Sequence, residues 1–376
     1  MCFVDHLENS DIMALSIHIS KKNNRDKKKI RIFLGAYVNF PNAQNINCDH
    51  IARYLDKDKF EVHTMYTSMC PINKAEYKEF GIHLHKLIHH RFIWYWCKYL
   101  AMLCGKFDIY YLPKQEPMDY RFADKHKKNV LISSVEGVVG EQIPIGNKNA
   151  ERYFNDLMTD YFSISRCIRD SVKRYWQKDS EVLYLGLDAP KGIIRKHTNI
   201  RSLIWIGSVI DRKRPELFLE CAKAFPEYLF VMIGDGDKLT HIKQIVERDG
   251  VNNLVLMGRI TNDEVYKELN KADLLLMTSD KEGLPKVIGE AMISGVPSIY
   301  INECYDVDYV KSGENGFAVA GLDEMKDKIQ YLIDHPEEYA EMSKKAAESV
   351  QEYLWPVLIK KYEEYFERVY KEKVKS

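Results

Sequence analysis

The sequence predicts an α/β fold in which two domains, each built on a doubly wound parallel sheet, face one another across a cleft. The chain has 376 residues, too many for a single ordinary hydrophobic core, and this length indicates two domains. From Ile30 onward, short β-branched or aromatic runs alternate with helical stretches, as in parallel strands joined by crossover helices. Most runs are continuously apolar, which is typical of strands covered by helices on both faces.

The candidate strands fall into two series. The first comprises Ile30–Ala36, Glu61–Thr67, Ile82–Leu87, Phe107–Leu112, Asn129–Ser134, Tyr161–Ser165 and Glu181–Gly186. The second comprises Ser202–Ser208, Tyr228–Gly234, Asn253–Gly258, Asp273–Ser279 and Pro297–Ile301. Between the two series, Leu187–Ile200 carries a proline, a glycine and several charges but no periodicity, so it is the expected linker.

These elements divide the chain into two Rossmann-like domains. We expect residues 30–190 to form the N-terminal domain and residues 191–353 the C-terminal domain. Residues 1–29 mix acidic and apolar pieces and end in the basic run KKNNRDKKK, so we expect a poorly ordered tail; contact of this tail with anionic lipid is the alternative. From about Leu354 to Lys371, apolar side chains recur at helical spacing, which predicts a closing helix.

The composition excludes several classes of protein. The formal net charge is +0 and the pI about 7.2, so no overall positive charge is present to bind nucleic acid. None of the cysteines lies in a C-x-x-C spacing and several sit in apolar runs, which is typical of buried thiols in a reducing compartment. The chain has neither an apolar run of the roughly 18 to 20 residues that a membrane span needs nor a basic-then-apolar leader, so we expect a cytoplasmic protein.

Glycines follow four strands of the second series. In open parallel sheets, ligands bind beyond the carboxyl ends of the strands, where helix N-termini present free N–H groups. One glycine at such a position is usually turn chemistry, but four in register indicate a binding edge. The segments are Gly207-Ser208, Gly234-Asp235-Gly236, Gly258-Arg259 and Ser279–Gly283.

The richest of these segments is Glu282–Gly295 (EGLPKVIGEAMISG). Pro285 suits the first helical position and Gly295 the stop, so we expect a helix of about ten residues between them. Free amides at the start of this helix predict an anion site. They belong to Gly283, Leu284, Lys286 and Val287.

Charged side chains surround the predicted anion site. Glu282 would repel a phosphate, so its carboxylate is better suited to accept hydrogen bonds from sugar hydroxyls; a favourable interaction with the helix dipole is the alternative. Glu290 lies among apolar neighbours and needs a partner, either ribose hydroxyls or a buried salt bridge. In the loop Asp211–Pro215, Lys213 or Arg212 can offset the charge of a diphosphate; a solvated surface cluster is the alternative.

With these residues, the C-terminal half resembles the nucleotide-binding domain of the family 4 retaining glycosyltransferases of GT-B fold. The most specific element is EGLPKVIGEAMISGVP, whose glutamates, Glu282 and Glu290, are separated by seven residues like those of the family's E-x7-E motif. The resemblance implies a GT-B fold whose C-terminal domain binds a nucleotide sugar. It also implies that the N-terminal domain lies on the acceptor side and is completed by the closing helix, residues 354–376.

The resemblance assigns donor-binding roles. The stretch GSVIDRKRPELFLE is similar to the family's glycine-arginine turn with a lysine six residues beyond the glycine, which assigns Lys213 to the donor phosphates; Ser208 stands where the family usually has arginine. Glu282 would contact the donor sugar and Glu290 the ribose. The Leu284 amide would contact a phosphate, and the turn from Gly258 to Ile260 the base. The full implied set is Gly207, Ser208, Arg212, Lys213, Gly234, Gly258, Arg259, Ile260, Glu282, Gly283, Leu284, Pro285 and Glu290.

In the first half, Gly35–Asn47 is placed like the family's loop that faces donor and acceptor. Val135-Glu136-Gly137 stands where many members have a histidine before glycine, which places Glu136 near the donor sugar. A carboxylate there could stabilise a cationic transition state or handle the acceptor proton; a surface glutamate is the alternative. The candidate catalytic residues are therefore Glu282, Lys213 and Glu136.

No metal is expected. Transferases of this fold with the E-x7-E motif work without one, and the resemblance implies no cofactor beyond the nucleotide-sugar donor. Asp306-Val307-Asp308 has the spacing of a D-x-D metal motif, but it falls where the family has a glycine-rich turn ending in an acidic residue. We therefore do not interpret it as a metal site.

One N-terminal segment, His83–Gly105, combines histidine and basic residues with several aromatic ones. This mixture is typical of a helix at a membrane interface, although an ordinary covering helix packed on the sheet uses many of the same residues. Relatives that build surface polysaccharides often meet lipid-linked acceptors in this way. The resemblance therefore implies peripheral membrane contact through this segment.

The predicted activity is transfer of a hexose-like sugar, with retention, from a nucleotide diphosphate such as a UDP-sugar to a hydroxyl acceptor. The expected acceptor is a glycan or a lipid-linked precursor of lipopolysaccharide or capsule. One alternative is a sugar-nucleotide epimerase or hydrolase on the same fold, which donor turnover without acceptor would favour. The other is a non-catalytic sugar-nucleotide-binding partner of another transferase, which activity of the purified protein, abolished by Glu282→Ala, would exclude.

Overall fold

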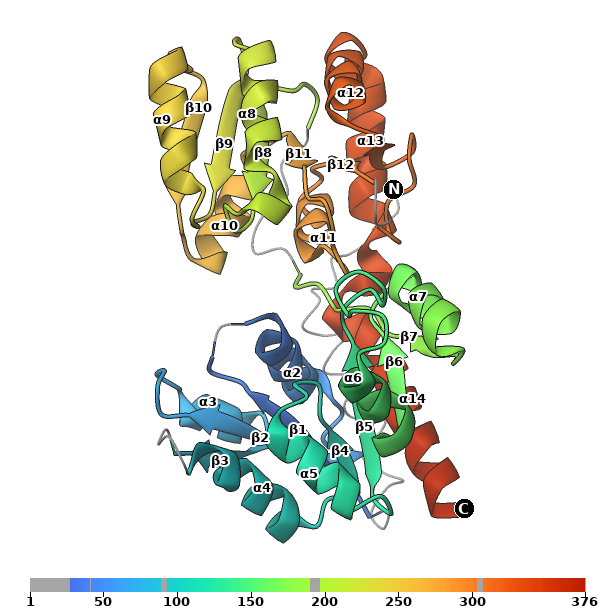
Figure 1. Ribbon diagram of the computed structural model, residues 1–376. Helices are drawn as coiled ribbons and strands as arrows, with labels where there is room; N and C mark the ends of the chain where they lie inside the picture. Colours follow the sequence, from blue (N-terminus) through green and yellow to red (C-terminus); the bar gives the residue numbers. More distant parts are fainter. Residues whose placement is uncertain (1–27, 41, 89–92, 190–196, 303–306, 376) are drawn as a thin grey trace, which may run out of the picture.

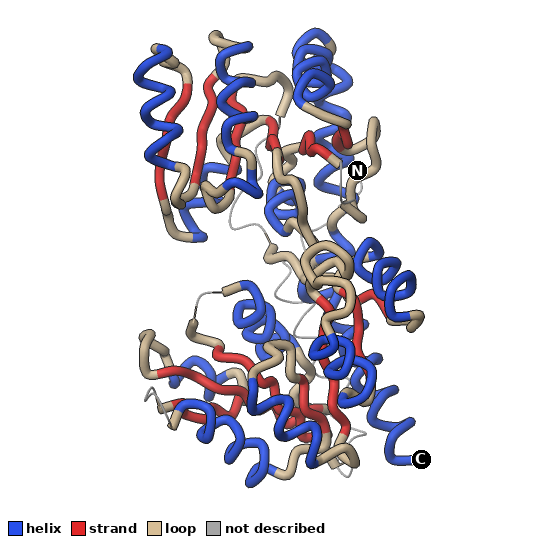
Figure 2. The backbone as a smooth tube through the Cα atoms, viewed as in Figure 1, coloured by secondary structure: helices blue, strands red, loops and turns tan. Residues whose placement is uncertain are grey.

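A computed structural model of the chain describes residues 28–40, 42–88, 93–189, 197–302 and 307–375. Two parallel sheets, flanked by helices, form two lobes (Figures 1 and 2). The predicted α/β class, with two doubly wound parallel-sheet domains, is therefore confirmed. Most of the predicted tail lies outside the described residues, as does the expected domain boundary at residues 190–191.

The N-terminal sheet has the strand order β3-β2-β1-β4-β5-β6-β7, and its strands pair in parallel. The order reverses at β1, which lies between β2 and β4, so the loops leaving β1 and β4 open a crevice at that point. The strands are β1 (Ile30–Tyr37), β2 (Phe60–Thr67), β3 (Ile82–Leu87), β4 (Ile109–Tyr111), β5 (Val130–Val135), β6 (Asp160–Ser163) and β7 (Glu181–Val182). The helices are α2 (Ala43–Tyr54), α3 (Lys74–Glu79), α4 (Trp94–Gly105), α5 (Pro117–Lys125), α6 (Lys148–Arg152), the π-helical turn η1 (Tyr153–Leu157) and α7 (Arg166–Trp176).

The C-terminal sheet has the order β10-β9-β8-β11-β12-β13, again with parallel pairs. Its order reverses at β8, so the loops leaving β8 and β11 border the second crevice. The strands are β8 (Ser202–Ile206), β9 (Leu229–Ile233), β10 (Leu254–Gly258), β11 (Leu274–Met277), β12 (Ser298–Ile301) and β13 (Gly316–Val319). The helices are the short η2 (Asp211–Lys213), α8 (Pro215–Ala224), α9 (Leu239–Asp249), α10 (Asn262–Leu269), α11 (Lys286–Ile293), α12 (Leu322–Asp334), α13 (Pro336–Ser349), the short η3 (Gln351–Tyr353) and α14 (Trp355–Lys375).

Each predicted strand has a counterpart in one of the sheets. β3 has the predicted bounds, whereas β7 contains only the first two residues of the predicted Glu181–Gly186. The chain beyond β7 leaves the sheet for the hinge between the lobes, where the Leu187 N–H donates to the Tyr353 carbonyl (2.9 Å). The sequence did not predict β13, because its four residues begin with a glycine and pair only with β12 at the sheet edge.

The closing helix α14 runs from the C-terminal lobe down the N-terminal lobe (Figure 1). Its Tyr365 ring lies 5.5 Å from the ring of Phe162, and its Phe366 ring lies 6.1 Å from that of Tyr111. Both partners belong to strands of the N-terminal sheet. The last helix of the chain therefore contributes its apolar side to the core of the N-terminal lobe.

The two crossings of the chain between the lobes lie side by side. The Trp355 N–H donates to the Leu187 carbonyl (3.0 Å), and the Trp355 indole stacks on the His50 ring of α2 (5.4 Å between centroids). A Cβ atom added at Gly186 would lie 2.3 Å from the Trp355 ring, so this position requires glycine. The hinge is therefore a packed junction that fixes α2 against the second crossing.

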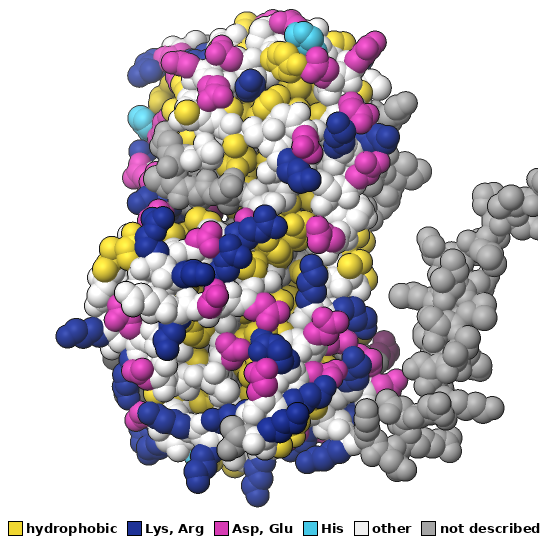
Figure 3. Space-filling model, turned by 90° about the vertical axis from the view of Figure 1, so that its right-hand side faces the viewer, with side chains coloured by type: hydrophobic (Ala, Val, Ile, Leu, Met, Phe, Trp, Pro, Cys, Tyr) yellow, Lys and Arg dark blue, Asp and Glu magenta, His cyan; other side chains and the backbone are white. Residues whose placement is uncertain are grey.

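Charged side chains of both signs lie on the face of the molecule in Figure 3. Basic and acidic side chains are interspersed over both lobes there, without a continuous basic area among the residues coloured by type. This distribution agrees with the net charge of +0. Within the described ranges, no helix combines the length and the apolar character needed to cross a bilayer.

Candidate functional site

The crevice of the C-terminal sheet brings together three of the predicted charged residues. Lys213 and Arg212 follow β8, and Glu282 follows β11. The Lys213 Nζ lies 2.5 Å from the Glu282 carboxylate, and an Arg212 Nη lies 3.0 Å from the same oxygen. The side chains of Lys213 and Glu282 are only 14% and 11% exposed. Residues far apart in the sequence thus meet at the point where the strand order reverses.

Glu282 balances the positive charge of this cluster. Burial lowers the pKa of Lys213, and the neighbouring carboxylate of Glu282 opposes that shift. A buried ammonium is stable only beside an anion. A diphosphate that enters the crevice can take over part of this role, which would release the Glu282 carboxylate to accept hydrogen bonds from sugar hydroxyls.

Arg214, which follows in the same loop, has a structural role. Its guanidinium donates to the carbonyls of Thr278 (2.7 Å) and Ser279 (3.2 Å) at the end of β11. These bonds hold the loop after β8 against the loop after β11. Arg212 also donates to a carbonyl, that of Lys281, but unlike Arg214 it contacts the Glu282 carboxylate.

The helix beside this cluster differs from the prediction at its start. α11 has eight residues and begins at Lys286, because the ψ of 89° at Pro285 is not helical and makes Pro285 the N-cap. Hydrogen bonds within the described part of the chain leave free the amides of Gly283, Leu284, Lys286 and Val287. The predicted unpaired N–H groups are therefore present where Glu282 and Lys213 meet.

The N-terminal lobe touches this helix start. The Ser165 hydroxyl donates to the Gly283 carbonyl (2.9 Å), and a Cβ atom added at Gly283 would lie 2.6 Å from the Glu136 carbonyl oxygen. The contact brings the predicted residues Glu136 and Gly283 together. It also fills the space on one side of Gly283, so an anion approaches the amides from the side of Lys213.

A pocket of about 590 Å³ continues the crevice along the carboxyl ends of β8, β9 and β10. Five of the predicted donor-binding residues line it: Gly207, Ser208, Gly234, Arg259 and Ile260. Gly258 lies at the same edge of the sheet, where its carbonyl accepts a hydrogen bond from the Gly234 N–H (2.9 Å). The backbone φ of Gly234 is +145°, and a Cβ atom there would lie 1.7 Å from the Gly207 carbonyl oxygen, so the wall excludes a side chain at this position.

Glu290 lies in α11 near the hinge. Burial raises its pKa, Lys286 and His50 oppose the rise, and Asp188 adds to it. Its carboxylate has no ion-pair or hydrogen-bond partner among the described residues. The predicted alternative of a buried salt bridge is therefore not formed within that part of the chain. Burial raises the pKa of Tyr266 of α10, and the nearby charge of Glu290 raises it further.

On the opposite wall, Glu136 follows β5. Burial raises the pKa of Glu136 to about 7, while hydrogen bonds from Ser134 (2.8 Å) and Gln44 and the charge of Lys114 oppose the rise. A carboxyl group with a pKa near neutrality can exchange a proton with a reacting hydroxyl. Glu136 is thus a partly buried titratable group at the crevice rather than a fully exposed surface glutamate.

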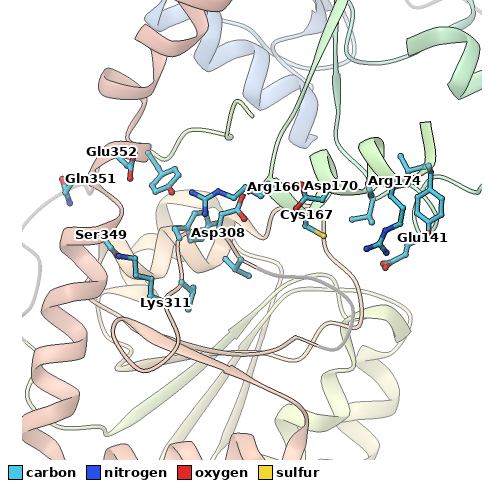
Figure 4. Close-up of a pocket in the computed structure, with 18 of the residues that line it drawn as sticks. Glu141, Arg166, Cys167, Asp170, Arg174, Asp308, Lys311, Ser349, Gln351 and Glu352 are labelled. Atoms are coloured by element: carbon cyan, nitrogen blue, oxygen red, sulfur yellow. Dashed lines mark hydrogen bonds between the residues drawn. The ribbon is translucent and has the colours of Figure 1, made fainter. Parts of the chain in front are cut away.

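A larger cavity, of about 1030 Å³, is lined by residues of both lobes (Figure 4). None of the predicted donor-binding or catalytic residues lines it. At its centre, the Arg166 N–H at the start of α7 donates to an Asp308 carboxylate oxygen (2.7 Å). Asp308 therefore joins the two lobes; Asp306, the other acidic residue of the rejected D-x-D motif, lies outside the described residues.

Glu61, His63 and His83 offer ligand atoms within 4.8 Å of one another, away from the crevices. The rings of His63 and His83 are stacked, with centroids 4.6 Å apart and planes 18° apart, so their nitrogen lone pairs do not converge on one point. The Arg31 guanidinium also forms a salt bridge with the Glu61 carboxylate (3.0 Å). This group is a stacked histidine cluster rather than a metal site.

Sequence reasoning missed Lys114 and the His50–Asp188 pair. Lys114 follows β4 at the crevice of the N-terminal sheet, and the His50 Nε2 lies 2.8 Å from Asp188 beside Glu290. The rule used for the second half, that functional groups follow strand ends, would have found Lys114 two residues beyond the candidate strand Phe107–Leu112. His50 lies inside a helix, and no local pattern marks it.

Comparison with known proteins agrees with this geometry. Residues 191–349 match the family model of the glycosyl transferases group 1. This part of the chain is similar to the group 1 glycosyl transferases. The matched range contains both loops of the Lys213–Glu282 cluster and the whole of α11, so the resemblance predicted from the sequence is confirmed.

Two curated relatives and one solved structure extend the comparison. An uncharacterized glycosyltransferase of Methanocaldococcus jannaschii is 24% identical over 194 residues, 51% of this chain and 54% of the relative. The UDP-Gal:alpha-D-GlcNAc-diphosphoundecaprenol alpha-1,3-galactosyltransferase of Escherichia coli is 29% identical over 199 residues, 51% and 50% of the two chains. The matches thus span about half the length of these relatives.

The crystal structure of the Anabaena protein HepE in complex with UDP and glucose has the same fold. Its TM-score is 0.75 at 15% sequence identity, and the match covers 90% of this chain and 100% of that chain. The similarity extends over both lobes, beyond the family match. The GT-B fold expected from the E-x7-E motif is therefore confirmed.

Proposed function

We propose that this protein transfers a hexose-like sugar from a nucleotide diphosphate to a hydroxyl acceptor, with retention of the anomeric configuration. The observation that carries the proposal is the cluster at the β8–β11 crevice, where Lys213 and Glu282 lie 2.5 Å apart beside the free amides of α11. Cations and amides suit a diphosphate, and the carboxylate suits sugar hydroxyls. The two loops of this cluster thus offer a partner for each half of a nucleotide sugar.

The reaction breaks the bond between the anomeric carbon and the diphosphate oxygen. The diphosphate leaves with the electron pair, and Lys213, Arg212 and the Leu284 amide stabilise its growing negative charge. An acceptor oxygen forms the new bond to the anomeric carbon, and the ionised Glu136 carboxylate accepts the hydroxyl proton. The proposal assigns neutralisation of the diphosphate to protein groups rather than to a metal ion.

The relatives support a UDP-sugar donor and a lipid-linked acceptor. The name of the Escherichia coli relative includes both UDP-Gal and a diphosphoundecaprenol-linked sugar, and the Anabaena structure contains UDP and glucose. We propose that this chain acts on the same classes of compound, in the assembly of a surface polysaccharide from cytoplasmic nucleotide sugars.

The proposal is tested by product analysis. We expect the purified protein to transfer a sugar from one member of a panel of α-linked UDP-sugars to a sugar linked to decyl diphosphate. Proton NMR of the product should show an α linkage, and Glu282→Ala should abolish its formation. A β-linked product would contradict retention. Release of free sugar without transfer would indicate a hydrolase instead.

We also propose that α4 meets a membrane surface. Its outer side carries exposed Trp96 (44%) and Leu100 (52%), and the Arg121 guanidinium lies 5.0 Å from the centre of the Trp96 ring. Aromatic, aliphatic and basic groups on one face are typical of helices that lie in the interface of a bilayer. The predicted segment His83–Gly105 thus places an amphipathic face on the acceptor lobe.

The membrane contact predicts sedimentation with vesicles. We expect the double variant Trp96→Ser/Leu100→Ser to lose about tenfold or more of its binding to vesicles with anionic lipid, because two anchoring side chains are removed. Leu229→Ser, which changes an equally exposed leucine of the C-terminal lobe (45%), is the control and should bind normally. Equal binding by all three proteins would refute the assignment of α4.

A further inference from the structure

The crevice of the N-terminal sheet contains a lysine that no part of the proposed mechanism uses. Lys114 follows β4, directly beside the point where the strand order reverses. It is half-buried, its Nζ lies 3.3 Å from the Asn45 side-chain oxygen at the start of α2, and 5.1 Å from the centre of the Tyr37 ring. Tyr37 is the last residue of β1, and Asn45 lies in the first turn of α2. By the order of the two sheets, the loop of Lys114 corresponds to the loop after β11 that contains Glu282, so each loop places a charged side chain at its crevice.

Lys114 differs from Lys98, Lys213 and Lys57 in having no strong partner. Lys98 lies 2.9 Å from Glu116 and 2.8 Å from Asp119, and Lys213 lies 2.5 Å from Glu282. Lys57 donates to two backbone carbonyls, of Leu55 and Arg53. For Lys114, no carboxylate oxygen lies within 4.0 Å of its Nζ in the part of the chain that the structure describes.

The carboxylates near Lys114 accept hydrogen bonds from other residues. Glu116 accepts from Lys98 (2.9 Å) and from the Tyr37 hydroxyl (2.5 Å). Glu136 accepts from Ser134 (2.8 Å), and its raised pKa makes it only partly charged near neutral pH. A half-buried ammonium without a counter-ion is costly, and an anion that reaches it gains a charge-assisted hydrogen bond. Within the described residues, no carboxylate therefore contacts the Lys114 ammonium directly.

We infer that Lys114 binds a phosphate carried by the acceptor, next to the sugar that receives the transferred residue. This inference rests on the proposed transferase activity and specifies its acceptor. The donor phosphates have their own cations, Lys213 and Arg212, on the opposite wall. Trp94, at the start of the α4 helix proposed to face lipid, lies 5.2 Å from Tyr37, ring centre to ring centre. The ammonium thus lies where a lipid-linked phosphate would enter the crevice.

The experiment compares two acceptors with the same sugar, one linked to decyl diphosphate and the other to decanol. For Lys114→Met we expect KM for the diphosphate acceptor to rise about 10- to 100-fold, the usual worth of a charged hydrogen bond, while kcat changes less than about threefold. KM for the decanol glycoside should stay the same, as should the affinity for UDP. Lys114→Arg should recover most of the loss. Lys78→Met, at an exposed position of α3, is the matched control.

Two other results would overturn the inference. Weaker binding of UDP to Lys114→Met would assign Lys114 to the donor phosphates. An equal loss with both acceptors, together with a shifted pH profile, would mean that Lys114 acts by setting the ionisation of Glu136. If the wild-type protein binds UDP but transfers sugar to neither acceptor, the proposed transferase function is refuted. This result comes from the wild-type protein alone, so it is distinguishable from a failure of the Lys114 inference.

Discussion

Replacing Lys213 by methionine should lower kcat/KM for sugar transfer by about 10²- to 10³-fold, the usual effect of removing one group that stabilises developing charge. Lys213 is the least exposed cation of the donor crevice, and its Nζ already lies 2.5 Å from a carboxylate oxygen. Methionine has nearly the same length and shape. Arg212 remains 3.0 Å from Glu282, so the variant retains a counter-ion for that carboxylate and should fold.

Steady-state kinetics and calorimetric titration with UDP measure the effect. We expect weaker UDP binding as well as a lower kcat, since the same cation meets the diphosphate before and after the bond breaks. Lys271→Met, which removes an exposed lysine (69%) of the same lobe, is the control and should match the wild type. Normal turnover by Lys213→Met, together with an unchanged melting temperature, would remove Lys213 from the mechanism.

Much of the donor side could be predicted because its signals are local. Apolar runs marked the strands, and residues that follow strands in a parallel sheet meet at one edge. Lys213 and Glu282 were therefore placed in one crevice although they are 69 residues apart. The ion pair between them could not be predicted, because it depends on how two loops pack. The non-helical backbone at Pro285 is a consequence of the same packing.

The acceptor side was harder to predict for two physical reasons. Lys114 follows its strand without a glycine, so the pattern used for the C-terminal half does not include it. The surroundings of Glu136 depend on Gln44 and Ser134, which approach it only in the folded lobe. The resemblance placed Glu136 near the donor sugar, and the structure adds that its backbone touches Gly283. Burial, which decides the chemistry of this carboxyl group, is a property of the assembled sheet.

Replacing Glu136 by glutamine should lower kcat by about 10²- to 10⁴-fold, the range expected when a general base is removed. Burial raises the pKa of Glu136 to about 7. In the wild-type enzyme, kcat should therefore fall as the pH decreases below about 7, because the protonated carboxyl group cannot accept a proton. Glutamine retains the shape and can still contact Ser134, but it does not titrate. A pH profile of Glu136→Gln that keeps the acidic limb would assign that limb to another group.

Stability should depend on pH in the opposite direction, which gives a second measurement of the same group. The pKa of Glu136 in the folded protein, about 7, is above the ordinary value of 4.5, so the folded state binds the proton more tightly than the unfolded state does. This contribution to stability is complete below the unfolded pKa and is lost as the pH rises through the folded pKa. The neutral variant Glu136→Gln should therefore gain in melting temperature relative to the wild type between about pH 5 and about pH 8. Glu314→Gln, at a largely exposed position (64%), should show no such gain, and an equal response of the two variants would contradict the burial of a titrating Glu136.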